Sequence, residues 1–144
     1  MRADPVVAGR DRCDARGVAA RVLIVDDHAP FRSLARRLLV AGGFQVVGEA
    51  ADGADALSAA RDLAPDVVLL DVQLPDIDGF AVAERLAARE GAPIVVLVSS
   101  RARLDYGFRV DASRARGFIA KAELSGEALL RIMSGPTGAS SCSG

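Results

Sequence analysis

The 144-residue chain has few of the residues that zinc sites, redox sites and disulfide-bonded folds require. It contains two cysteines, Cys13 and Cys142, and one histidine, His28. Neither cysteine has a histidine or a second cysteine at a metal-ligand spacing, which excludes a zinc or iron–sulfur site. Both cysteines lie in segments that we expect to be chain ends, so we interpret them as reduced residues without a role.

The chain also lacks a long hydrophobic run and an excess of charge of one sign. No apolar stretch approaches the length of a membrane span, and residues 1–20 mix charged residues with glycine and proline instead of forming a signal peptide. We therefore expect a cytoplasmic protein that does not bind membranes. Its 18 basic and 19 acidic residues give a net charge of −1. Such a balance leaves no electrostatic footprint for direct binding to nucleic acid.

The chain has almost no lysine, although it has many basic residues. Of the 18 basic residues 17 are arginine, and Lys121 is the only lysine. The two residue types are not interchangeable where a compact charge must reach a phosphoryl oxygen. A stray lysine alone would mean little, so the position of Lys121 relative to other motifs decides its significance.

The hydrophobic residues, 51% of the chain, are sufficient for one core and are organised in five short apolar runs. These runs alternate with five stretches of helical spacing and show no internal repeat, which predicts an α/β domain with a doubly wound, five-stranded parallel sheet and helices on both faces. The predicted strands are 21–25, 44–50, 67–70, 94–98 and 117–120, and the predicted helices are 30–41, 54–63, 80–89, a short one near 104–110, and 125–133. We expect a flexible leader at 1–20, one domain at 21–133 and a flexible tail at 134–144.

Polar residues follow the predicted strands at the points where the strands end. Asp26 and Asp27 follow the first strand, Asp71 the third, Ser99 the fourth and Lys121 the fifth. Because the carboxyl ends of parallel strands share one edge of the sheet, these side chains should lie close together. Each could separately be a helix cap, a turn former, a loop residue or a surface charge, and it is their convergence that favours a site.

Three carboxylates at one sheet edge repel one another and require a compensating cation. Oxygen ligands without cysteine favour a hard ion, Mg²⁺ or Mn²⁺. A lysine and a hydroxyl beside such an ion fit phosphoryl transfer to a carboxylate, with Asp71 as the nucleophile. We interpret His28 as a loop residue that flanks this acidic group.

Three motifs in this arrangement resemble those of the response-regulator receiver domains of bacterial two-component signalling. They are VLIVDDH at 22–28, DVVLLDVQLPDIDG at 66–79 and GFIAK at 117–121. The resemblance covers residues 21–133 and implies the flavodoxin-like receiver fold.

The resemblance also implies a phosphoacceptor and a metal site. Asp71 would accept the phosphoryl group. Asp27 and Asp71, with the main-chain carbonyl of Gln73, would bind Mg²⁺, and Asp26 would hold a water molecule of the metal.

A second set of residues would respond to phosphorylation. Lys121 would pair with the phosphoryl group, Ser99 would donate a hydrogen bond to it, and Phe118 would be the switch aromatic residue. Counting forward from Pro93 places the switch hydroxyl at Val98, which has none, whereas counting back from Lys121 places it at Ser99, which we prefer.

The function implied is that of a phosphoacceptor in a two-component phosphorelay. A sensor histidine kinase or phosphotransfer protein would phosphorylate the domain, and the face formed by the fourth helix, the fifth strand and the fifth helix would then bind a downstream protein or a second copy in a homodimer. We expect a stand-alone domain without an output domain, which dephosphorylates itself but turns over no external substrate.

Three alternatives remain open at this stage. The chain could be a pseudo-receiver that binds partners without phosphorylation, or the receiver half of a truncated DNA-binding response regulator. It could also be a Mg²⁺-dependent phosphatase, but phosphatases of the haloacid dehalogenase type place a second acid two residues after the nucleophile, and Gln73 occupies that position.

Overall fold

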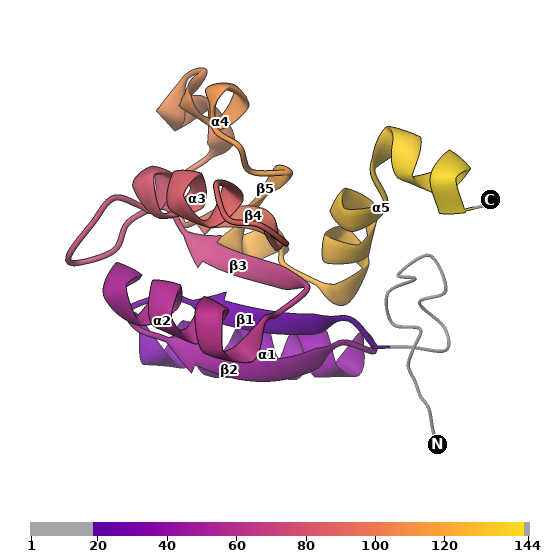
Figure 1. Ribbon diagram of the computed structural model, residues 1–144, viewed down its shortest axis with the longest axis horizontal. Helices are drawn as coiled ribbons and strands as arrows, with labels where there is room; N and C mark the ends of the chain where they lie inside the picture. Colours follow the sequence, from indigo (N-terminus) through magenta and orange to yellow (C-terminus); the bar gives the residue numbers. More distant parts are fainter. Residues whose placement is uncertain (1–18, 143–144) are drawn as a thin grey trace.

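The computed structural model describes residues 19–142, and the side chains as far as Ser134. Five parallel strands form one sheet in the order β2-β1-β3-β4-β5 (Figure 1). The strands are β1 (Arg21–Val25), β2 (Gln45–Ala50), β3 (Val67–Asp71), β4 (Ile94–Ser99) and β5 (Gly117–Ala120). The helices are α1 (Ala29–Ala41), α2 (Gly53–Leu63), α3 (Gly79–Ala87), α4 (Arg109–Ala112) and α5 (Gly126–Cys142), with 3-10 turns η2 (Arg103–Tyr106) and η3 (Lys121–Glu123). The predicted doubly wound α/β fold is confirmed.

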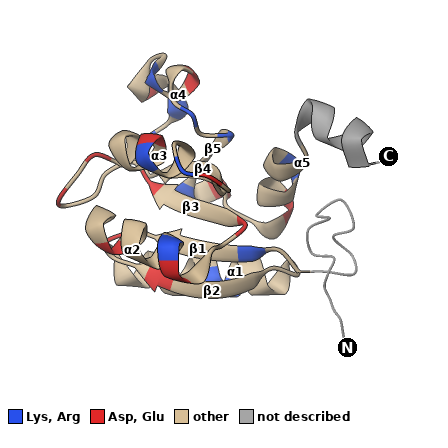
Figure 2. Cartoon of the chain, viewed as in Figure 1, with Lys and Arg blue, Asp and Glu red and all other residues tan. Residues whose placement is uncertain are grey.

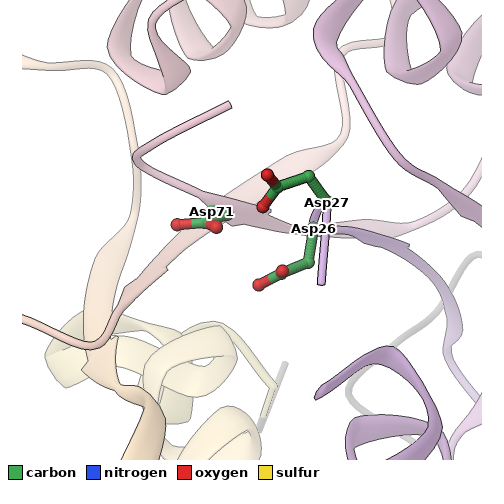
Figure 3. Close-up of side chains that lie close together, drawn as sticks. All are labelled: Asp26, Asp27 and Asp71. Atoms are coloured by element: carbon green, nitrogen blue, oxygen red, sulfur yellow. The ribbon is translucent and has the colours of Figure 1, made fainter. Parts of the chain in front are cut away.

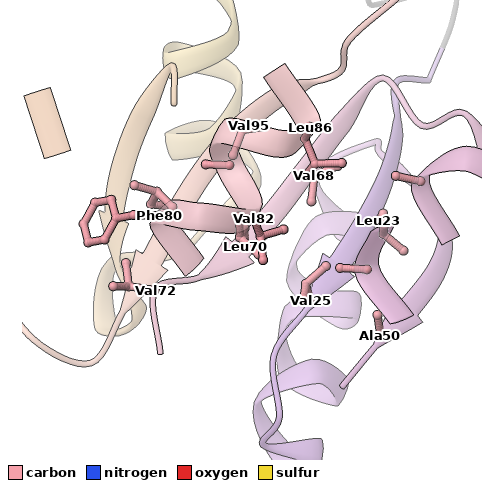
Figure 4. Packing of buried hydrophobic residues seen from close by; sticks show 14 of the residues in the cluster. Leu23, Val25, Ala50, Val68, Leu70, Val72, Phe80, Val82, Leu86 and Val95 are labelled. Atoms are coloured by element: carbon pink, nitrogen blue, oxygen red, sulfur yellow. The ribbon is translucent and has the colours of Figure 1, made fainter. Parts of the chain in front are cut away.

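Strand β3 lies at the centre of the sheet and is buried along its whole length, from Val67 to Asp71. Its continuous apolar run is the pattern of a strand that is covered on both faces, because neither set of alternating side chains can face water. Leu70 packs on one face with residues of α2 and α3, and Figure 4 shows part of this cluster. Leu69 packs on the other face with residues of α1 and α5.

Helices α1 and α5 approach each other closely at one point on their face of the sheet. A Cβ atom added to Gly42 would lie 2.8 Å from the Cα atom of Gly126, and the reverse is also true. Neither position can carry a side chain without moving backbone. The start of α5 is thereby fixed against the end of α1.

The predicted fourth helix is wrong in its form. In place of one helix near Leu104–Val110 the chain forms η2 and a single turn of α4, which are separated by Gly107 at a φ of +60°. Only Val110 is buried in these two elements, because the arginines of this stretch interrupt the apolar pattern.

The predicted end of the last helix is also wrong, since α5 continues through Ser134–Pro136 to Cys142. Proline removes one helical hydrogen bond and can bend a helix without ending it. The start of this helix is as expected, with the Ser125 hydroxyl accepting the N–H of Ala128.

Other expectations lie at the limits of the described residues. Cys13 and nearly all of the leader at 1–20 lie outside them, and nothing is described of the Cys142 side chain. Among the helices of the described part, none is both long enough and apolar enough to cross a membrane. Figure 2 shows both basic and acidic residues on α4.

Candidate phosphoryl-transfer site

Three carboxylates meet where the carboxyl ends of β1 and β3 lie side by side (Figure 3). Asp71 is the last residue of β3, and Asp26 and Asp27 follow β1 directly. One carboxylate oxygen from each lies within 4.8 Å of the others. We call these three residues the acidic cluster. The strand ends bring it together as the sequence indicated.

Asp26 is the most buried member of the acidic cluster, with 0% of its surface exposed. Its Oδ1 accepts the N–H of His28 at 2.7 Å, which places His28 in the loop beside the cluster as expected. Its Oδ2 forms an ion pair with Nζ of Lys121 at 2.6 Å. This ion pair compensates part of the cost of burying the Asp26 carboxylate.

Lys121 brings a positive charge to the cluster from the end of β5. Its Nζ lies 3.4 Å from Oδ2 of Asp71 and 4.6 Å from the centre of the Phe31 ring, in the first turn of α1. Burial alone would lower the pKa of Lys121, but the contact with Asp26 and the charge of Asp71 outweigh burial and raise it. The ammonium therefore keeps its charge at neutral pH.

Asp71 has a perturbed acidity in the absence of a metal. Burial is the largest cause and, together with the charge of Asp26, raises the pKa of Asp71 from 3.8 to about 6. The N–H of Gln73, which Oδ1 accepts at 3.1 Å, and the charge of Lys121 act in the opposite direction. A further cation nearby would stabilise the ionised form of this carboxylate.

The acidic cluster fits a divalent metal ion by its donor chemistry. It offers oxygen ligands alone, among them the carboxylate of Asp27, which is exposed. Such a set matches the preference of Mg²⁺ or Mn²⁺ for hard ligands and for partial hydration. The one ammonium beside it does not balance three carboxylates.

Ser99 is the hydroxyl residue at this edge of the sheet. In the pairing of β3 with β4, Asp71 lies opposite Val98, whose side chain is buried in the core beside α1 and α5. Ser99 is the next residue and is 1% exposed. Its Oγ lies 2.5 Å from Oη of Tyr106 and accepts the N–H of Arg101 at 3.0 Å. The structure thus brings a hydroxyl to the strand end at Ser99, and the hydroxyl bonds to Tyr106.

Phe118 belongs to a row of three aromatic rings beside the site. The Tyr106 ring centre is 6.0 Å from that of Phe118 and 5.8 Å from that of Phe80. Tyr106 is half-buried and lies in η2, which follows β4. Phe118 is therefore in contact with the segment that also carries the partner of Ser99.

Tyr106 and Asp76 also contribute to this region, although the sequence does not indicate the contacts of either residue. Tyr106 is the only tyrosine of the chain, a signal that was available but had no motif around it. Asp76 follows Pro75, a sequence that is typical of a turn. Its carboxylate in fact accepts the N–H groups of Gly53 and Ala54 at 2.8 and 3.0 Å, which ties the loop after Asp71 to the start of α2.

Comparison with known families identifies the fold and the motifs. The family of the response regulator receiver domain matches residues 22–133. Protein-glutamate methylesterase/protein-glutamine glutaminase 6 of Anaeromyxobacter dehalogenans is 44% identical over 119 residues, which are 82% of this chain and 34% of that protein. The DNA-binding transcriptional activator EvgA of Escherichia coli is 32% identical over 70% of this chain and 50% of its own length. The chain thus spans half or less of these two relatives.

Solved structures agree with this assignment. The signal receiver domain of NarL from Mycobacterium tuberculosis has a TM-score of 0.70 and 36% identity, covering 78% of this chain and 94% of that domain. The response regulator domain of CheB from Thermotoga maritima has a TM-score of 0.70 and 25% identity, covering 81% and 95%.

Proposed function

The chain belongs to the response regulator receiver domain family, and we propose that it is a phosphoacceptor of a two-component phosphorelay, phosphorylated on Asp71. The observation that carries the proposal is the position of Asp71, which is central in the sheet and within 4.8 Å of two further carboxylates. In the methylesterase and activator relatives the matching segment is part of a longer protein, and their activities are not ascribed to this chain.

Phosphorylation would form one bond and break one. A carboxylate oxygen of Asp71 attacks the phosphorus of a phosphohistidine, the P–N bond breaks, and its electron pair returns to the imidazole nitrogen, which takes up a proton. With a pKa of about 6, Asp71 is largely ionised at neutral pH and able to attack. Lys121 compensates part of the charge that collects on the phosphoryl oxygens.

Three of the residues that would form the cation site, Asp26, Asp27 and Asp71, already lie close together. Asp27 and Asp71, with the main-chain carbonyl of Gln73, would hold Mg²⁺, and Asp26 would orient a water molecule beside it. When bound, Mg²⁺ neutralises negative charge on the transferred group and helps to align it.

Two groups would respond to the phosphorylated state. The Ser99 hydroxyl would donate a hydrogen bond to the phosphoryl group, and Phe118 would repack beside it. We propose that α4, β5 and α5 form the surface that then binds a downstream protein, with a homodimer as the alternative, and that the donor is a sensor histidine kinase or a phosphotransfer protein. The domain would lose phosphate by its own hydrolysis and would turn over no external substrate.

Intact-mass analysis after treatment with acetyl phosphate tests the proposal. We expect wild type to gain one phosphoryl group when Mg²⁺ is present, and to gain none with a chelator. Asp71→Asn should stay unlabelled, whereas Asp66→Asn, which alters a part-buried carboxylate at the start of β3, should be labelled normally.

Two outcomes would contradict it. Equal labelling of wild type and Asp71→Asn would show that another residue is modified. Absence of labelling under all conditions, with a folded protein, would instead favour a pseudo-receiver that acts by constitutive binding.

A further inference from the structure

Ser99 is held by Tyr106 in this structure. The hydroxyl of serine has one proton and two lone pairs, and that of Ser99 already contacts Oη of Tyr106 at 2.5 Å and accepts the N–H of Arg101. No contact of this hydroxyl with Asp71 is present among the described residues. A hydroxyl that binds a phosphoryl oxygen must donate its proton there.

The direction of the Ser99 side chain makes the two contacts compete. Side chains alternate along a strand, and Leu97 of β4 packs on the face of α2 and α3, so Ser99 points to that same face. Asp71 directs Oδ2 to Lys121, on the face of α1 and α5. The hydroxyl therefore has to turn away from Tyr106 before it can reach Asp71.

The ring of Tyr106 is held separately from its hydroxyl. It packs edge-on to Phe80 at 68° and is tilted by 56° to Phe118. Phe118 stands at the position of the switch aromatic but has no hydroxyl, and Tyr106 supplies one from a different element. Removing the hydroxyl alone should leave the ring packing in place.

We propose that Tyr106 is a positioning residue that restrains Ser99 in the resting state and releases it when Asp71 carries a phosphoryl group. This proposal rests on the proposed function. Because Tyr106 is the last residue of η2, its release also removes one of the bonds that hold the η2–α4 segment, residues 103–112. That segment presents Leu104 and Phe108, which are 90% and 81% exposed, so the change at Ser99 reaches an apolar surface.

The first test measures the affinity for beryllofluoride, a phosphoryl mimic, in the presence of Mg²⁺. Tyr106→Phe removes the resting contact and should tighten binding roughly 2- to 10-fold, the equivalent of one hydrogen bond. In a Ser99→Ala background the same substitution should change nothing, because the partner of the hydroxyl is absent. Ser100→Ala, at the exposed neighbouring serine, is the matched control and should bind as wild type does.

The second test observes Tyr106 directly. The chain has one tyrosine and no tryptophan, so its intrinsic fluorescence comes from Tyr106 alone. Beryllofluoride with Mg²⁺ should shift this fluorescence in wild type toward that of ligand-free Ser99→Ala, and should change Ser99→Ala itself far less.

Equal affinity of wild type and Tyr106→Phe would overturn the proposal, and so would the same gain in both Ser99 backgrounds. If wild type binds no beryllofluoride, the proposed function is refuted. The restraint of Ser99 by Tyr106 is then tested separately, by amide hydrogen exchange of the ligand-free proteins. Tyr106→Phe and Ser99→Ala should both exchange the amides of residues 101–112 faster than wild type, and unchanged exchange would overturn the restraint.

Discussion

Lys121 lies closer to Asp26 than to Asp71, with its Nζ 2.6 Å from Oδ2 of Asp26 and 3.4 Å from Oδ2 of Asp71. In this structure, therefore, the only lysine of the chain is held mainly by a carboxylate that is not the proposed phosphoacceptor. A phosphoryl group on Asp71 would offer it a second, more highly charged partner.

Lys121→Arg should weaken beryllofluoride binding by roughly 10-fold or more although the charge is kept. The larger planar guanidinium does not fit the space of a compact ammonium between Asp26 and the ring of Phe31. Calorimetric titration in Mg²⁺ measures the change, and Arg131→Lys on the exposed side of α5 serves as the control. Affinity equal to that of wild type would show that Lys121 does not contact the phosphoryl group.

Asp27→Ala and Asp26→Ala should have different effects on Mg²⁺ binding and on stability. Asp27 is exposed and free to coordinate, so its loss should reduce Mg²⁺ affinity by roughly 10-fold or more with little change in the melting temperature. Asp26 is buried against Lys121, so its loss should destabilise the domain and reduce Mg²⁺ affinity less. Titration and thermal unfolding of both variants decide the matter, and equal losses of affinity would contradict the assignment.

Asp71→Asn should stabilise the metal-free domain at neutral pH. The folded-state pKa of about 6 lies above the ordinary aspartate pKa of 3.8, so ionisation of Asp71 disfavours the folded state, and wild type loses stability as the pH rises between these two values. Asparagine avoids this cost, which we put at roughly 1–2 kcal/mol after allowing for solvent screening.

Thermal unfolding in chelator at several pH values checks this prediction. The two proteins should differ at pH 7 and converge below pH 3.8, where both carry a neutral side chain. A difference that grows as the pH falls would contradict the sign of the effect.

Asp76→Ala should lower the melting temperature at neutral pH by removing the acceptor for two N–H groups at the start of α2. The hydrogen bond from Gly53 is the main cause of the lowered pKa of Asp76, so its contribution is present above the ordinary value of 3.8 and is lost as the pH falls through the lower folded-state value. Asp62→Ala, at an exposed carboxylate in the same helix, is the control. A loss of the same size at acidic and neutral pH would argue against a role for the ionised carboxylate.

The elements that could be predicted from sequence are those in which a local pattern and the tertiary environment agree. The apolar run before Asp71 predicts a strand covered on both sides, and the structure buries it completely. Asp26, Asp27 and Lys121 could be placed because each follows a strand directly, and parallel strands end at a common edge.

The remainder depends on contacts that no local pattern shows. The η2–α4 segment has one buried residue, so its form is decided by a glycine turn and by the packing of Tyr106 against Phe80 and Phe118. The hydrogen bond between Tyr106 and Ser99 joins two different elements. The partner of a tyrosine in a stretch without regular periodicity cannot be predicted from the local sequence. Asp76 was similarly ambiguous, because an aspartate after proline suits a turn whether or not it also caps a distant helix.

The contact between Gly42 and Gly126 gives the response of this domain a direction. Lys121 is separated from Gly126 by only a few residues. The backbones of Gly126 and Gly42 pack directly against each other, because neither residue has a side chain. A pull on Lys121 cannot slide the start of α5 along α1, because the two backbones would collide. The displacement would therefore be taken up on the other side of Lys121, in β5 and at Phe118. The contact would then keep the start of α5 in the same place relative to α1 in both states of the domain.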